Sequence, residues 1–88
     1  MATFKLVIST PDGNSYAGEA ASLSLRGAEG DLAILAGHIP FATTVQPGQC
    51  HIETEDGTIR RGTLDGGLLT VSTENVTLLS GSFQWEEE

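Results

Sequence analysis

The chain has 88 residues, 39% hydrophobic and 18% charged, which is typical of one soluble globular domain. Twelve acidic residues against four basic ones give a formal net charge of −8. Because nucleic acids and anionic lipids are bound by clustered cations, this charge argues against a nucleic-acid-binding protein and against an anionic-lipid-binding surface.

Hydrophobic residues alternate with a period of two along the whole chain, which is typical of strands buried on one side. In chain order, the alternating runs cover 4–9, 21–26, 50–53, 69–72 and 76–78. No window has the i, i+3, i+4, i+7 spacing of an amphipathic helix. The pattern therefore predicts an all-β protein.

Turn-forming residues separate these runs. Thr10-Pro11-Asp12-Gly13 joins a proline with a preset φ to a glycine that accepts a positive φ. Asp56-Gly57, between 52–55 and 58–61, predicts a hairpin with a two-residue loop. About ten short strands predict an antiparallel β-sandwich or flattened barrel over residues 1–84. We expect the acidic C-terminal tail, residues 85–88, to be frayed.

Residues with catalytic or metal-binding potential are few and poorly spaced. His38 and His51 could ligate a metal only with acids such as Asp31 or Glu53, and neither histidine has a recognised ligand spacing. Cys50 and His51 are neighbours in a predicted strand, so their side chains point to opposite faces and cannot form a nucleophilic pair. Cys50 fits a small core residue, and a single cysteine builds no disulfide framework. We expect no catalytic residue, metal or cofactor.

The apolar runs are far shorter than the roughly 20 residues that span a bilayer, and the N-terminus lacks a signal-peptide pattern. We therefore expect an intracellular soluble protein.

The segment that looks adapted to binding is Gly27–Pro40, GAEGDLAILAGHIP. Glu29 and Asp31 flank a glycine there, and we expect His38 near the same end. The segment Gly27–Pro40 is either a solvated loop followed by a buried strand or an acidic recognition turn on a rigid scaffold. The sequence does not decide whether Phe41, Ala42 and Val45 lie in the core or form an exposed apolar strip.

Four segments form a pattern that runs in order through nearly the whole chain. They are FKLVISTPDG (4–13), EGDLAILAGHIPF (29–41), VQPGQCHI (45–52) and LDGGLLTVSTENVTLL (64–79). Together they resemble the epsilon subunit of F-type ATP synthases. The resemblance implies the ten-stranded β-sandwich that forms the N-terminal domain of that family, and a non-catalytic subunit of the central stalk.

The resemblance also implies partners. In that family the domain joins the gamma subunit to the membrane ring of c subunits, in a proton-translocating rotor that couples ion flow to ATP synthesis. It implies a peripheral place on the cytoplasmic face of the bacterial cell membrane, without insertion. The c-ring interface implied by the family motif comprises Glu29, Gly30, Asp31 and His38. The gamma interface is expected around Pro40, Phe41, Ala42 and Thr43.

The sequence also departs from the family. The family usually continues into two α-helices that inhibit ATP hydrolysis and in some members bind ATP, and no such segment follows here. We expect a naturally short subunit without those functions. Ala36 stands where the family often has proline, which loosens that turn. The alternative is a free-standing β-sandwich ligand-binding module, although one Trp, one Tyr and three Phe offer few stacking platforms for sugars.

Overall fold

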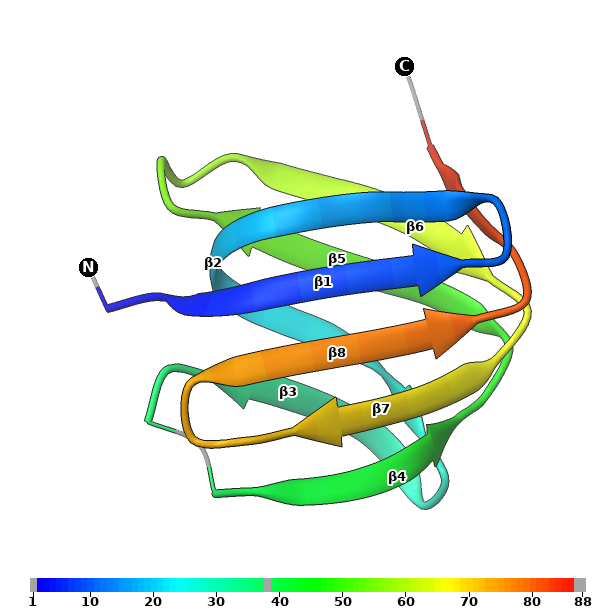
Figure 1. The fold of residues 1–88 in the computed structure, drawn as a ribbon, viewed down its shortest axis with the longest axis horizontal. Coiled ribbons are helices and arrows are strands. Elements are labelled where there is room, and N and C mark those ends of the chain that lie inside the picture. Colours follow the sequence, from blue (N-terminus) through cyan, green and yellow to red (C-terminus); the bar gives the residue numbers. More distant parts are fainter. Residues whose placement is uncertain (1, 38, 87–88) are drawn as a thin grey trace.

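The computed structural model describes residues 2–37 and 39–86, which form nine β-strands joined by turns (Figure 1). The strands are β1 (Phe4–Thr10), β2 (Gly13–Gly27), β3 (Gly30–Leu35), β4 (Phe41–Val45), β5 (Gly48–Thr54), β6 (Ile59–Leu64), β7 (Gly67–Val71), β8 (Asn75–Ser80) and β9 (Phe83–Trp85). The all-β prediction is confirmed. Across the described ranges, no helix is long and apolar enough to cross a membrane.

Two layers share the long strand β2. Its first part pairs with β1, and its second part pairs with β3 on one side and β5 on the other. A register shift between Ala20 and Ser22 marks where β2 bends from one layer into the other (Figure 1). The first layer holds β1, β8, β7 and β4, and the second holds β3, β5, β6 and β9. Because β2 belongs to both layers, the described residues build the two layers from nine strands, where the sequence predicts about ten.

One strand pairing is not antiparallel. β1 runs parallel to β8, with Lys5 opposite Asn75 and Ser9 opposite Leu79. Parallel neighbours require a long connection, and here almost the whole sandwich lies between the two strands. β1 therefore lies between β2, the next strand in the sequence, and β8, a strand far from it in the sequence.

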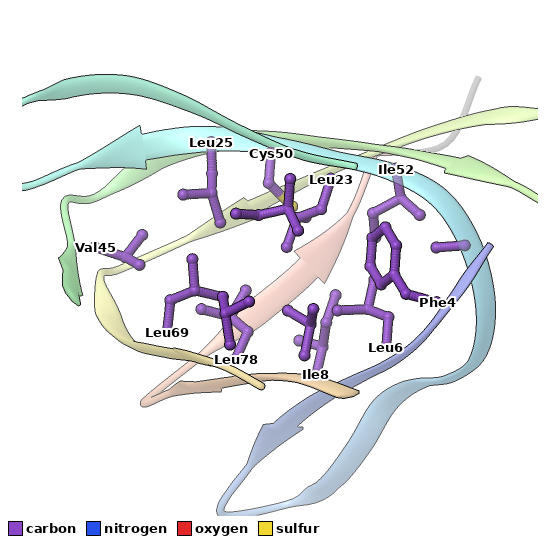
Figure 2. Close-up of a cluster of buried hydrophobic side chains, with 14 of the residues drawn as sticks. Phe4, Leu6, Ile8, Leu23, Leu25, Val45, Cys50, Ile52, Leu69 and Leu78 are labelled. Atoms are coloured by element: carbon purple, nitrogen blue, oxygen red, sulfur yellow. The ribbon is translucent and has the colours of Figure 1, made fainter. Parts of the chain in front are cut away.

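The core lies between the inner faces of the two layers. Side chains of β1, β7 and β8 point toward those of β2 and β5 (Figure 2). The residues labelled there are Phe4, Leu6, Ile8, Leu23, Leu25, Val45, Cys50, Ile52, Leu69 and Leu78. Burial raises the pKa of the Cys50 thiol to about 11, while the neighbouring His51 is only partly buried. Cys50 is thus a core residue, as predicted.

The predicted turns are present, with one difference. Gly13 has a φ of +127° after Pro11 and Asp12. The second hairpin closes with the Thr54 N–H donating to the Thr58 carbonyl at 2.9 Å, so its loop has three residues instead of two. Gly57 is the last of them, with a φ of +88°. A loop of this length ends on a left-handed residue, so the glycine fixes the turn and the loop length shifts by one residue.

The carboxylate of Asp56 organises this loop. It accepts hydrogen bonds from the Thr54 hydroxyl and from the Thr58 N–H at 3.0 Å, and the Thr54 bond is the main cause that lowers the pKa of Asp56 to about 2. Because this pKa is depressed, its contribution to stability is complete above the unfolded pKa, near 3.8, and is lost as the pH falls toward 2.

We expect Thr54→Val to raise the pKa of Asp56 measurably, because it removes the hydroxyl donor. A carboxyl-detected NMR titration would measure this pKa, and the Thr58 amide shift should follow the same midpoint. Thr10→Val, in another turn, is the control and should leave the midpoint near 2. An unchanged midpoint in Thr54→Val would show that the hydroxyl does not hold the carboxylate.

In the predicted tail, residues 85 and 86 differ from the expected frayed end, while residues 87–88 lie outside the described residues. Trp85 completes β9, pairs with Gly62 and donates its indole N–H to the Ser15 carbonyl at 3.1 Å. The Arg60 guanidinium lies 3.8 Å from the centre of the Trp85 ring. The Glu86 N–H donates to the Arg61 carbonyl at 2.9 Å. Aromatic packing and backbone pairing hold these residues on the sandwich despite the acidic composition of the segment.

Candidate functional site

The predicted acidic turn is the tip of the β2–β3 hairpin. Gly27 pairs with Gly30 across the two connecting residues, and Gly30 has a φ of +131°, a conformation suited to glycine. Glu29 and Asp31 are exposed. Arg26 lies across from Asp31, with 3.4 Å between its Nε and Oδ1 of Asp31. Both groups are open to solvent, so the ion pair is weak and leaves the carboxylates accessible to a partner.

The hairpin tip is attached to the neighbouring β4–β5 connection. The Gln46 N–H donates to the Arg26 carbonyl at 2.9 Å, and its side-chain amide donates to the Ala28 carbonyl at 3.4 Å. Val45, the residue before, pairs with Gly27 at the corner between the layers. The turn therefore has the support of two connections, which fits a recognition loop on a rigid scaffold.

The open question about β4 is answered by its pairing. Val45 is buried in the core, whereas Ala42 is exposed and Phe41 is 37% exposed beside its partner Val71. Thr43 is partly buried, and Pro40 is exposed just before the strand. Ala42 thus lies on the outer face, whereas Phe41 is a partly exposed residue on the same side of β4 as the buried Val45.

The structure brings most of the two predicted interfaces to one place. A shallow depression of about 340 Å³ is lined by residues 27–32 from the hairpin and by residues 41–43 from β4. His38 lies outside the described residues, and its part in an interface stays a prediction. The whole of β3 lies between the acidic turn and Ala36, where the connection toward β4 begins.

The candidate metal residues lie apart from this depression or on its rim. Asp31 and His51 line another open depression, of about 530 Å³, on the outer face of the second layer. Glu53 pairs with Ser22 on the same face. Among the residues that the structure describes, no group of three or more His, Cys, Asp or Glu side chains could hold a metal.

One surface was not anticipated from the sequence. The outer face of the first layer carries a run of uncharged side chains on adjacent strands, with Leu68 opposite Leu79 and Thr70 opposite Thr77. Its residues, here called the uncharged face, are Val7, Ser9, Ala42, Thr44, Leu68, Thr70, Thr77 and Leu79, and the exposed Lys5 lies at its margin on the same side of β1. Leu68 is 44% and Leu79 is 47% exposed.

The doublets Leu68-Leu69 and Leu78-Leu79 were the available signal for this face. In an alternating strand, one leucine of each doublet must point outward. An uncharged face that presents two leucines is notable in a chain of net charge −8. With the acidic hairpin tip, it gives the molecule two surfaces of contrasting chemistry, both suited to contacts with proteins.

Comparison with known proteins agrees with this architecture. The family model "ATP synthase, Delta/Epsilon chain, beta-sandwich domain" matches residues 3–86. The "ATP synthase epsilon chain, sodium ion specific" of Acetobacterium woodii is 37% identical over 86 residues, covering 98% of this chain and 65% of that protein. The "ATP synthase epsilon chain" of Clostridium novyi is also 37% identical, with 98% and 66% covered. The chain thus spans about two thirds of the length of these curated relatives.

Solved structures show the same fold. A chain in the cryo-EM structure of the Euglena gracilis mitochondrial ATP synthase matches with a TM-score of 0.89 at 24% identity, covering 97% of this chain and 54% of that one. A chain in the Tetrahymena thermophila central stalk and c-ring structure matches with a TM-score of 0.75 at 15% identity, covering 93% and 66%. From the family match across residues 3–86 and these relatives, we conclude that the chain belongs to the ATP synthase delta/epsilon family and comprises its β-sandwich domain.

Proposed function

We propose that this chain is a non-catalytic subunit of the ATP synthase central stalk that joins the gamma subunit to the c ring and so couples ion flow to ATP synthesis. Family membership and the names of the relatives support this role. The observation that carries it is the pair of contrasting surfaces, the acidic hairpin tip and the uncharged face, on one packed sandwich. A coupling element needs two attachment surfaces on a body that does not deform.

The proposed gamma interface starts at Pro40, Phe41, Ala42 and Thr43 and continues over the uncharged face. Ala42 belongs to both, because it lies on the outer side of β4 opposite Thr70. Leu68 and Leu79 would form the apolar centre of the contact. Interface centres are depleted of charge and enriched in large apolar side chains, which is the chemistry of this face.

The proposed c-ring interface is the hairpin tip, with Glu29, Gly30 and Asp31, and the part of His38, which lies outside the described residues, stays a prediction. The two carboxylates are exposed, and Gly30 permits the tight approach of a partner backbone. Complementary charge on the ring loops would favour association and fix orientation. The chain would thereby lie peripherally at the cytoplasmic face of a bacterial membrane, held there through the complex.

The mechanism that follows is mechanical. A β-sandwich core packs as densely as an organic crystal, so relative sliding of the two layers breaks many contacts at once. β2 joins the layers covalently. Near the C-terminus, the Trp85 indole N–H donates a hydrogen bond to the Ser15 carbonyl, which links the two layers again. Torque applied at the ring-facing tip would therefore reach the gamma-facing surface with little loss.

Native mass spectrometry of the purified chain with its cognate gamma subunit tests this function. We expect a one-to-one complex. A chain that is folded by circular dichroism and forms no complex would contradict the rotor role and favour a separate ligand-binding module.

We expect Asp31→Lys to weaken attachment to the c ring by about three- to tenfold at low salt, since it reverses one exposed interfacial charge. Binding of the gamma complex to reconstituted c rings would measure this effect, and high salt should reduce it. Asp12→Lys, an equal charge change in the β1–β2 turn, is the matched control. Equal attachment of both variants and the unmodified chain would remove Asp31 from the interface.

A further inference from the structure

Strand β3 has one edge with no strand beside it. It pairs with β2 along its full length, from Gly27 opposite Gly30 to Ser22 opposite Leu35. In residues 2–37 and 39–86 no other strand pairs with β3, and no backbone hydrogen bond from outside the sheet reaches it. The strand lies in the layer behind β7 and β8 (Figure 1). Its second edge is therefore open to a partner.

The orientation of the free backbone groups follows from the neighbouring bonds. The Arg26 carbonyl accepts from the Gln46 N–H at 2.9 Å, so it points away from β3. Asp31, the partner of Arg26, is therefore in a non-hydrogen-bonded pair and directs its own N–H and carbonyl to the free edge. The alternation of an antiparallel ladder gives Ala33 and Leu35 the same orientation.

Beyond Asp31, this edge lacks the usual protection against pairing. Natural edge strands carry charges, prolines or bulges that prevent another strand from binding. Residues 32–35 of β3, Leu-Ala-Ile-Leu, contain no charge and no proline, and their register with β2 is regular. The two ends of the strand differ: Glu29 and Asp31 lie at its start, whereas Leu35 at its end is 59% exposed and Ile39, on the connection to β4, is 79% exposed.

We propose that the free edge of β3 binds an extended segment of a partner protein by strand addition. Unpaired backbone donors and acceptors select a peptide backbone as the ligand. Charge complementarity places a basic residue of that segment beside Glu29 and Asp31, and apolar residues beside Leu35 and Ile39. This contact goes beyond the proposed function, because it does not depend on which subunit supplies the strand.

A second copy of the chain fits this edge poorly. Two copies would bring two net charges of −8 together. An antiparallel β3–β3 pair would also place each Asp31 beside the apolar end of the other copy. A segment with a basic end and an apolar end satisfies both ends of β3 at once.

The test uses the whole chain and a synthetic peptide of about eight residues, with alternating valine and threonine and two lysines at one end. We expect NMR to show binding and slower hydrogen exchange of the Asp31, Ala33 and Leu35 amides. Ala33→Pro should weaken binding about tenfold, because it removes an outward N–H. The strand itself should tolerate this proline, since that N–H has no partner within the fold. Ala33→Val, which keeps the amide, is the matched control and should bind normally.

Three results would overturn the proposal. The first is no peptide binding, or binding that protects other amides in the unmodified chain, a readout that needs no variant to fold. The second is equal affinity of Ala33→Pro and Ala33→Val. The third is a dimer of the free chain that Ala33→Pro abolishes, because the edge would then belong to a second copy.

Discussion

Gly67→Ala will lower the free energy of unfolding by about 3 kcal/mol or more. A Cβ placed on Gly67 would lie 2.0 Å from the carbonyl oxygen of Leu79, which is backbone of the adjacent strand. Gly67 pairs with Ser80, so β8 cannot retreat without loss of the β7–β8 ladder. Urea unfolding followed by Trp85 fluorescence measures the change.

The control is Gly18→Ala, in the first part of β2. The three atoms nearest to a Cβ there all belong to the Tyr16 side chain, at 3.7–3.9 Å, which is ordinary packing distance. We expect a change within about 0.5 kcal/mol. If the two alanine variants were equally stable, the close approach of β7 and β8 at Gly67 would be wrong.

The second large effect concerns the uncharged face. We expect Leu68→Lys to weaken the complex with gamma by about a hundredfold, because it places a charge at the apolar centre of the proposed interface. The folded chain should be little affected, since Leu68 is exposed and faces away from the core. Titration calorimetry with the cognate gamma subunit, beside a thermal melt of the variant alone, separates the two effects.

Ile59→Lys is the matched control for this prediction. Ile59 is 54% exposed, slightly more than Leu68, and pairs with Glu53 on the second layer. The same substitution there should leave gamma binding unchanged. Loss of binding in Ile59→Lys with normal binding in Leu68→Lys would place gamma on the opposite layer.

Local patterns predicted the strands because alternation and turn chemistry are encoded within a few residues. The core position of Cys50 and the glycine turns at 13 and 57 follow from such signals. The bend of β2 from one layer into the other does not follow from local signals, because the bulge near Ala20 depends on two partner strands that are distant in sequence. The three glutamates that follow Trp85 indicate a solvated tail, whereas its contacts with Ser15 and Arg60 arise only in the folded chain.

The candidate site was predictable in part. The acidic turn follows from Glu29, Gly30 and Asp31, since glycine and adjacent carboxylates indicate an exposed hairpin tip. The uncharged face was not, because it forms only when four strands align their outward residues. The free edge of β3 was also hidden, because strand neighbours are set by topology.

The parallel pairing of β1 with β8 has a consequence for biosynthesis. Lys5 to Ser9 must wait for Asn75 to Leu79, so the first strand of the domain to leave the ribosome gains its second neighbour only when nearly all of the domain has been made. Contacts between such distant segments also slow folding after release. The domain is therefore expected to fold as one cooperative unit only after β8 has been made, and a nascent chain that stops before β8 would expose the inner face of β1 to chaperones.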